Sequence, residues 1–390
     1  MKEKLILKDF KYFGGRHCLT TSLKSMLAYH NLKVSEEMLF GLGGGLSFIY
    51  WYNKRMRVPF IGGRHGKVIE SLVNTCSRLG AEATVFETAS TKKGYEKLKE
   101  QLRRGEPAYV FVDMPYLNYL VLPPTAHFGG HAVVVFGLDE EANKAYIADR
   151  AKKAVFATVD ELNKARSSKF PPFPAKNKLL EIKYPAKLAS LEDGIKAAIT
   201  ESCNQMLKPP IKNSGLSGIK KWADEVVKWP EQFKGMNLFS CLFSLFVYCE
   251  FGTGGGFRPM YAQFLKEASS ILNEPALNDV AAMFDKSGKV WREITTAALP
   301  NWWPTLKKIR ELSLKKNRIF EEYPPDAEQK LKKLEAEVTH SLIRKKVVSE
   351  FGNLKDKDVA RLVGGLRQKI LQLYEIERQA FETLNNINLK

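Results

Sequence analysis

Residues 131–150 read HAVVVFGLDEEANKAYIADR and contain two strands from which the fold class can be inferred. His131 to Leu138 contains four consecutive β-favouring residues, and Lys144 to Ala148 forms a second short strand after an acidic turn. Two strands joined by such a turn pair antiparallel, so their outer ends meet. We therefore predict that His131, which starts the first strand, and Asp149, which ends the second, meet across the ladder.

The strands and helices around this pair predict an α+β fold. Pro107 to Val112 precedes it as an apolar, β-rich run, and Ala154 to Thr158 and Leu179 to Tyr184 follow it as short strands. Amphipathic helices come earlier in the chain. Helices first and an antiparallel sheet afterwards indicate an α+β domain over residues 1–185.

The first of these helices begins at Cys18. Leu19, Leu23, Met26 and Leu27 recur at helical spacing after a Gly14-Gly15 turn. The N-terminus of a helix lowers the pKa of a thiol through its unpaired N–H groups and dipole. A cysteine on a helix tip, a histidine to take its proton and a carboxylate to orient the imidazole form a catalytic triad in its cysteine form, so Cys18, His131 and Asp149 are the candidate catalytic residues.

Other interpretations of these residues stay open. Cys18 could be structural, His131 could cap its strand, and Asp149 could hold a turn. His127 is a rival base, but we favour His131 because the end of a strand holds a ring more rigidly than a loop does. His17 is a poor base for Cys18 because successive helical residues point about 100° apart, so we expect it in the wall of the site.

A second short helix starts at Ser35-Glu36-Glu37 and ends in the glycine-rich Gly41-Leu-Gly-Gly-Gly45. We expect a flexible loop after it, with the following aromatic side chains: Phe48, Tyr50, Trp51 and Tyr52.

Beyond Pro185 almost every periodic stretch is helical. Prolines at 209, 210, 230, 300, 324 and 325 separate these stretches as helix breakers do. Three long charged helices are predicted from Thr305 to Asn385. The second domain therefore covers residues 186–390 and is mainly helical.

The composition excludes several classes of protein. The longest apolar run, Leu238 to Cys249, is too short to cross a bilayer and is interrupted by Ser240 and Ser244. The N-terminus has no signal-peptide pattern, so we expect no membrane span and a cytoplasmic location. The five cysteines include no C-x-x-C pair and the histidines have no ligand pattern around them, so no metal site is predicted.

The net charge of +18 bears on partners and not on the fold. Nucleic acid, anionic lipid or an acidic protein such as a carrier protein would suit such a surface. The sequence contains no zinc finger, RNP-like motif or basic tract, so nucleic acid is not expected. Gly254-Gly-Gly256 lacks the Lys-Ser/Thr of a phosphate loop and is expected to be a plain turn, so no cofactor is predicted.

An ordered set of motifs resembles the N-terminal domain of the butirosin biosynthesis protein H family. The second half, with Gly255-Gly-Phe-Arg258 and Tyr261-Ala-Gln-Phe-Leu265, resembles the helical domain usually attached to it. The motifs of the first half are Gly15-Arg-His-Cys18, Leu27-Ala-Tyr-His30, Ser35-Glu-Glu, Phe40-Gly-Leu-Gly-Gly-Gly-Leu-Ser-Phe48, Val112-Asp-Met-Pro-Tyr-Leu-Asn-Tyr119, Gly130-His-Ala-Val-Val-Val-Phe-Gly137 and Ala148-Asp-Arg150.

The resemblance implies a papain-like fold and an acyltransferase of secondary metabolism. The acyl group would move from a thioester, such as that of an acyl carrier protein, through Cys18 to the amine of a small molecule. A cysteine peptidase or amidase, or a binding protein that keeps the scaffold without chemistry, are the alternatives. Related peptidases place a glutamine before the cysteine as an oxyanion donor, and residues 8–17 contain none.

Asp113 and Tyr116 are the candidate residues for binding the amine. Asp113 follows a predicted strand, and Tyr116 and Tyr119 come shortly after it. A carboxylate beside aromatic rings suits a cationic amine, and a role in capping the following turn is the equal alternative. The oligomeric state is not predicted.

Overall fold

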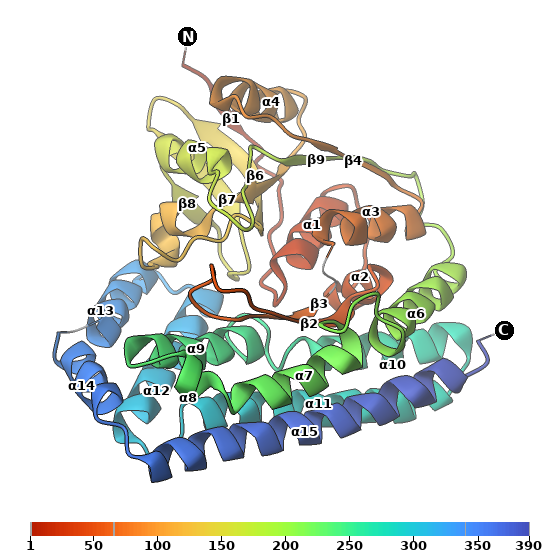
Figure 1. Cartoon of the computed structure of the whole chain (residues 1–390). Helices are drawn as coiled ribbons and strands as arrows, with labels where there is room; N and C mark the ends of the chain where they lie inside the picture. Colours follow the sequence, from red (N-terminus) through yellow and green to blue (C-terminus); the bar gives the residue numbers. More distant parts are fainter. Residues whose placement is uncertain (1, 65–66, 340, 390) are drawn as a thin grey trace. The chain divides into compact units, whose positions relative to one another are not determined.

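A computed structural model of the chain describes residues 2–64, 67–339 and 341–389 (Figure 1). The chain forms two compact units, each made of three segments. Unit 1 comprises residues 1–39, 75–189 and 315–336, and unit 2 comprises residues 40–74, 190–314 and 337–390. The chain passes between the units within α2 (Glu36–Leu42), α3 (Val68–Arg78), α12 (Pro304–Glu322) and α13 (Ala327–Thr339), and once in a loop.

Unit 1 contains an antiparallel sheet whose strand order is β4-β9-β5-β6-β7-β8, with β1 paired to β6 as well. The pairing register places Val112 opposite His131 and Val134 opposite Ala148. The strands are β1 (Lys4–Ile6), β4 (Glu82–Phe86), β5 (Ala108–Val112), β6 (His131–Asp139), β7 (Lys144–Ala148), β8 (Val155–Ala157) and β9 (Leu179–Lys183).

Helices cover both faces of this sheet, which is why every residue of β5 and β6 is buried. Val110 of β5 packs in one apolar cluster with Leu98 of α4 (Thr91–Arg103) and Leu162 of α5 (Val159–Ser167). Its neighbour Tyr109 donates a hydrogen bond to the carbonyl oxygen of Leu19 on α1 (Cys18–Tyr29) at 3.1 Å. Successive side chains of a strand point to opposite faces, so α1 lies on one face and α4 and α5 lie on the other.

Residues 315–336 complete the core of unit 1. Phe320 of α12 and Leu331 of α13 belong to the same apolar cluster as the strands, and the Phe320 ring stacks on Tyr119 with centroids 6.5 Å apart. Lys316 is mostly buried, and its ammonium group donates to the carbonyl oxygen of Val121 and to the carboxylate of Glu335. A late segment of the chain therefore packs as part of the sheet unit.

Unit 2 is mainly helical, with one two-stranded hairpin. Helix α15 packs along α11, α7 and α6 (Figure 1). Its apolar residues recur every three or four positions, which gives it a continuous buried face. The elements are β2 (Leu46–Trp51), β3 (Phe60–Arg64), α6 (Glu192–Leu207), α7 (Gly215–Val226), α8 (Trp229–Gln232), α9 (Met236–Cys249), α10 (Arg258–Leu272), α11 (Ala276–Ala298), α14 (Ser341–Gly352) and α15 (Asp356–Asn386).

A buried ion pair joins several of these elements. The guanidinium of Arg258 binds both carboxylate oxygens of Glu377 at 2.7 Å, and both side chains are fully buried. Arg258 also donates to the carbonyl oxygens of Gly63 at 2.6 Å and Gly256 at 2.9 Å. Glu377 in turn accepts a hydrogen bond from the indole N–H of Trp291 at 2.8 Å. The pair links α10, α15, α11 and β3 at one point.

The predicted α+β class is confirmed, and the strands from 107 to 184 lie within a residue or two of their predicted ends. The expectation of a flexible loop at 48–52 was wrong, because residues 46–51 form β2 and pair with β3. The sequence LSFIYW is rich in β-favouring residues, and the glycines before it end at Gly45. Helices α12 to α15 occupy the described residues of the region where three long helices were expected, and residue 340, between α13 and α14, lies outside the described residues.

The predicted division at residue 185 differs from the two compact units. One passage between the units falls at 189, close to the predicted boundary. Unit 2 nevertheless begins at residue 40, since the β2–β3 hairpin packs against α7 and α6, and unit 1 takes up residues 315–336. Within the described residues, no helix is both long enough and apolar enough for a membrane crossing.

Candidate active site

Cys18 is the first residue of α1, and His17 is the N-cap. Cys18 is partly exposed, whereas the thiols of Cys76, Cys203, Cys241 and Cys249 are buried. Burial raises the pKa of Cys76 to about 12, and it raises the pKa of the other buried thiols as well. Cys18 is therefore the thiol that a reagent or substrate can reach.

His131 and Asp149 form a buried pair. Nε2 of His131 lies 2.8 Å from Oδ2 of Asp149, and the two side chains are 4% and 0% exposed. The hydroxyl of Tyr119 donates to the same carboxylate oxygen at 3.0 Å, and the backbone N–H of Arg150 donates to Oδ1 at 2.6 Å. Both oxygens of Asp149 are thus satisfied, which fixes the carboxylate against the ring.

Each member of the pair stabilises the charged form of the other. Burial alone lowers the pKa of His131 and raises that of Asp149. The opposite charge of the partner outweighs burial, so the net pKa of His131 lies above its usual value and that of Asp149 lies below. Charge on the Cys18 side chain and its hydrogen bond with the imidazole add to the rise at His131. The imidazole is therefore a partner of both Asp149 and Cys18.

Two hydrogen bonds to backbone carbonyl oxygens bring Cys18 to this pair. The hydroxyl of Ser22 on α1 donates to the carbonyl oxygen of Ala132, the residue after His131, at 3.3 Å. The N–H of Gly15 donates to the carbonyl oxygen of Arg150, the residue after Asp149, at 3.0 Å. The loop and the helix on either side of the cysteine are thus tied to the strand ends that carry the histidine and the aspartate.

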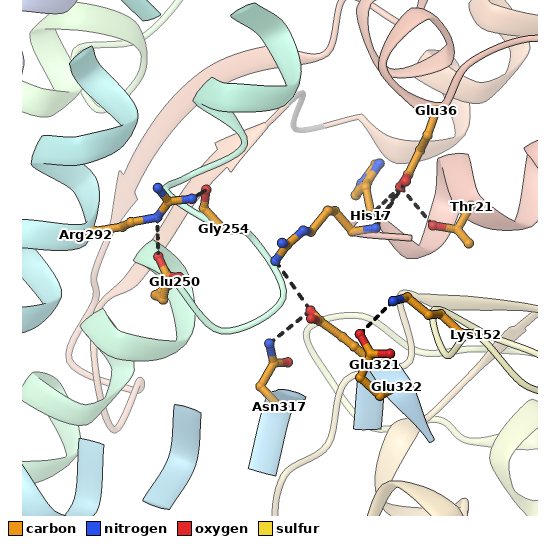
Figure 2. A network of polar contacts seen from close by, with 11 residues as sticks. His17, Thr21, Glu36, Lys152, Glu250, Gly254, Arg292, Asn317, Glu321 and Glu322 are labelled. Carbon is orange, nitrogen blue, oxygen red and sulfur yellow. Dashed lines mark hydrogen bonds and ion pairs between the residues drawn. The ribbon is translucent and has the colours of Figure 1, made fainter. Parts of the chain in front are cut away.

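A buried carboxylate, Glu36, holds the loop before the cysteine (Figure 2). Its Oε1 accepts hydrogen bonds from the N–H of His17 at 2.7 Å, from the N–H of Arg16 at 3.0 Å and from the hydroxyl of Thr21 at 2.8 Å. Burial raises the pKa of Glu36, although these hydrogen bonds oppose the rise. Helix α1 has no side-chain cap from its N-cap residue, so Glu36 supplies the acceptor from another helix.

This arrangement requires glycine at position 15. A Cβ atom at Gly15 would lie 2.1 Å from Oγ1 of Thr21 and 2.7 Å from Oε2 of Glu36. Any side chain there would displace the residues that anchor the loop. The Gly15-Arg-His-Cys18 motif therefore has a packing reason for its first residue.

A second histidine–aspartate pair lies in the same unit. Nδ1 of His127 is 2.8 Å from Oδ2 of Asp113, and that oxygen also accepts a hydrogen bond from the hydroxyl of Ser168 at 2.6 Å. Oδ1 of Asp113 accepts from the N–H of Phe128 at 2.7 Å. Asp113 is fully buried, so a substrate would meet His127 before it met the carboxylate.

The remaining predicted residues lie near these two pairs. Tyr116 is in a short 3₁₀ helix, Met114–Tyr116, and its ring centroid is 5.8 Å from that of His127. His17 is 7% exposed, and its Nδ1 is 3.2 Å from the hydroxyl of Thr20. The structure thus brings Cys18, His131 and Asp149 together and places Asp113 and Tyr116 around His127.

Residues 315–336 flank the loop that precedes Cys18. The guanidinium of Arg16 is 3.5 Å from Glu321. Lys152 forms an ion pair with Glu322 at 2.6 Å (Figure 2). The N–H of Lys152 also donates to the carbonyl oxygen of Glu321 at 2.8 Å. The helices that the sequence left without a role therefore contribute to the surroundings of the site.

Sequence reasoning missed three contacts around the site: those of Glu36 with the loop before Cys18, of Tyr119 with Asp149, and of Ser168 with Asp113. The Ser35-Glu-Glu motif predicted the start of its own helix and formed part of the family resemblance, but it gave no sign of a contact with the loop before Cys18. Within the described residues, no group of three or more His, Cys, Asp or Glu side chains is placed to hold a metal ion. A hollow of about 460 Å³ in unit 2, between α6 and the end of α15, contains none of the predicted site residues.

Fold and site together define an α+β protein in which a cysteine at the start of a helix contacts a buried histidine–aspartate pair. The family model described as butirosin biosynthesis protein H, N-terminal, matches residues 17–150, and that of a domain of unknown function (DUF4872) matches residues 160–302. The chain belongs to the butirosin biosynthesis protein H family and carries the second domain after it. No curated protein matches the chain.

Proposed function

We propose that the protein is an acyltransferase that carries an acyl group on Cys18. The observation that carries this proposal is the imidazole of His131, which contacts the Cys18 side chain and binds Asp149 at 2.8 Å. The matched family segment, residues 17–150, includes all three residues. Cys18 is accessible whereas the other four cysteines are buried, and this difference supports the same assignment.

The first half-reaction forms the acyl-enzyme. Nε2 of His131 is engaged by Asp149, so Nδ1 is the ring nitrogen left to take the Cys18 proton. The thiolate attacks the carbonyl carbon of an acyl thioester, a new C–S bond forms, and the donor thiolate leaves with the proton of His131. Asp149 keeps the imidazole oriented and stabilises its cationic form.

The second half-reaction releases the acyl group to an amine. The amine nitrogen attacks the thioester carbon, the C–N bond forms as the C–S bond breaks, and His131 receives a proton from the nitrogen. The Cys18 thiolate beside the His131 imidazolium is restored. If water attacked in place of the amine, the same residues would make a hydrolase, so the acceptor decides between acyltransferase and peptidase or amidase activity.

The test is intact-protein mass spectrometry after incubation with a panel of acyl thioesters. We expect one acyl group per chain, located at Cys18, and none on the Cys18→Ala variant. Cys76→Ala is the matched control, because its thiol is buried and we expect it to acylate like wild type. His131→Ala should lower the rate of acylation by several orders of magnitude, whereas Asp149→Asn should cost less than loss of Cys18.

Three outcomes would contradict the proposal. A folded wild-type chain that stays unmodified with every thioester, and whose Cys18 does not react with iodoacetamide at neutral pH, would favour a binding protein on the same scaffold. Acylation that is as fast in His131→Ala as in wild type would remove the assigned base. Acyl-enzyme that is released only to water, whatever amine is offered, would make the protein a hydrolase.

A further inference from the structure

We propose that His127, held by Asp113, is the base that deprotonates the amine acceptor. This inference rests on the proposed acyl transfer and assigns the acceptor a site of its own. An amine that is protonated at neutral pH cannot attack a thioester until its nitrogen loses a proton. His131 takes the proton of the Cys18 thiol, so a second group is needed to take the proton of the ammonium.

The geometry of His127 is that of an oriented general base. Asp113 lies 2.8 Å from Nδ1, so the neutral ring donates its Nδ1–H to the carboxylate and presents a lone pair at Nε2. Within the described part of the chain, Nε2 has no hydrogen-bond partner. The His127 side chain is 19% exposed, so a ligand can reach it.

Burial of Asp113 leaves neither carboxylate oxygen without a partner, because His127, Ser168 and the N–H of Phe128 all contact these oxygens. An aspartate whose only role was to cap the turn would need no more than one of these three contacts. The set fixes the carboxylate in position under the imidazole, as a second set of contacts fixes Asp149 under His131.

The surroundings of His127 suit an alkylammonium group. Its ring stacks on Phe170 with centroids 3.5 Å apart, and Phe170 is 45% exposed. The ring of Tyr116 is also near His127, with centroids 5.8 Å apart. Ring faces attract a cation, so the site combines attraction for the ammonium with a lone pair that takes its proton.

The site lies close enough to His131 to serve the same reaction. Val112 pairs with His131, and Asp113 is the next residue along. His127 lies four positions before His131 in the chain, so their Cα atoms are at most roughly 14 Å apart. The two bases therefore stand at one end of the sheet, within the span of a small molecule.

The loop that carries His127 is packed tightly. A Cβ atom at Gly129 would lie 2.3 Å from the carbonyl oxygen of Phe173 and 2.6 Å from the backbone nitrogen of Ala175. The absence of a side chain lets residues 168–175 approach, and these residues carry both Ser168 and Phe170. The close packing holds the aromatic ring and the hydroxyl against the histidine–aspartate pair.

Nε2 of His127 takes a proton from the alkylammonium group and leaves a neutral amine. The amine forms the C–N bond, the C–S bond to Cys18 breaks, and the second proton of the nitrogen passes to His131. The Cys18 thiolate, the His131 imidazolium, the amide and a protonated His127 remain, and His127 then releases its proton to water.

The test measures the two half-reactions of His127→Gln separately. Acylation of Cys18 should stay within about twofold of wild type. Release of the acyl group to a primary alkylamine at neutral pH should slow by about 100-fold or more, the typical contribution of a general base. Release to methoxyamine, which is unprotonated at neutral pH, should slow by less than about threefold, because that acceptor needs no deprotonation.

His30→Gln is the matched control. His30 also pairs with a carboxylate, Glu106 at 2.9 Å, and stacks on an aromatic ring, Tyr184, but it lies at the opposite end of α1 from Cys18. It should leave both half-reactions unchanged. Because Gln can still donate an N–H to Asp113, His127→Gln keeps the buried carboxylate paired.

Two results overturn the inference and leave acyl transfer standing: equal loss with the alkylamine and methoxyamine, which a merely structural role would give, or no loss with either. Failure of the wild-type chain to acquire an acyl group at all would overturn the proposed function itself and this inference with it. The acylation step and the release step are measured apart, so the two failures are distinguishable.

Discussion

Replacement of Glu36 by alanine tests whether this carboxylate anchors the loop in front of Cys18. The change would leave three close donors without their acceptor: the N–H of His17 at 2.7 Å, the hydroxyl of Thr21 at 2.8 Å and the N–H of Arg16 at 3.0 Å. The hydroxyl of Thr20 loses less, since it also lies 3.2 Å from the carbonyl oxygen of His17.

The size of the effect follows from these contacts. A buried donor left without a partner costs about 1–3 kcal/mol, so the two buried donors, of His17 and Thr21, give at least about 2 kcal/mol, and the part-buried N–H of Arg16 adds up to about 1 kcal/mol. We take the lower end, because removing the carboxylate also removes the cost of burying it, which the raised pKa of Glu36 reflects. The expected loss in the free energy of unfolding is therefore about 3 kcal/mol for Glu36→Ala.

Glu36→Gln is the matched variant. Oε1 alone accepts all three close hydrogen bonds, so a glutamine whose oxygen takes that place keeps them. We expect a loss of less than about 1 kcal/mol. Denaturant unfolding followed by circular dichroism gives the overall values, and hydrogen exchange of residues 16–29 shows whether the loss begins at the loop. Equal losses in the two variants, or an alanine variant as stable as wild type, would refute the anchoring role.

Three further predictions concern charge. The variant Asp149→Asn removes the ion pair with His131. In wild type the pair contributes its full stability between pH 3.8, the ordinary pKa of an aspartate, and pH 6.5, that of a histidine. The contribution is lost as pH falls through the lowered pKa of Asp149, and it is lost as pH rises through the raised pKa of His131. The stability difference from wild type, measured by hydrogen exchange of β6, should therefore be largest near about pH 5 and shrink in strong acid and in base, and a pH-independent difference would contradict this. Glu377→Ala should cost about 3–5 kcal/mol, because it leaves the Arg258 guanidinium buried without its counter-charge. Tryptophan fluorescence reports this loss, since all six tryptophans lie in unit 2, and a cost below about 1 kcal/mol would contradict it. Finally, acylation of Cys18 by an acidic carrier-linked thioester should slow steeply as salt shortens the Debye length from roughly 30 Å at 0.01 M to about 8 Å at 0.15 M, and a free thioester should not; equal salt dependence would remove the carrier protein as donor.

Local patterns predicted the parts of the site that belong to regular strands and helices. His131 and Asp149 stand at the ends of two strands whose pairing follows from a short turn, so their proximity could be predicted from the sequence alone. Cys18 begins its helix as the apolar spacing indicated. These inferences used only neighbours within about 20 positions.

Contacts between distant segments were not predictable in this way. Glu36 serves a helix other than its own, and nothing in its local sequence distinguishes it from Glu37 beside it. Ser168 reaches Asp113 across 55 positions of chain. Asp113 was expected to face the substrate, but a buried carboxylate and an exposed one look the same in a single sequence.

Because residues 315–336 belong to unit 1, this unit cannot complete its core until late in translation of the chain. All strands of that unit are translated by residue 189, but Phe320 and Leu331, which belong to its apolar core, emerge only after about 130 to 140 more residues. At ribosomal rates of about 5–20 residues per second, the nascent chain waits roughly 7 to 30 seconds for them. During that interval the ribosome holds a sheet with part of its apolar surface uncovered. The accessible thiol of Cys18 would therefore meet its finished surroundings only near the end of translation.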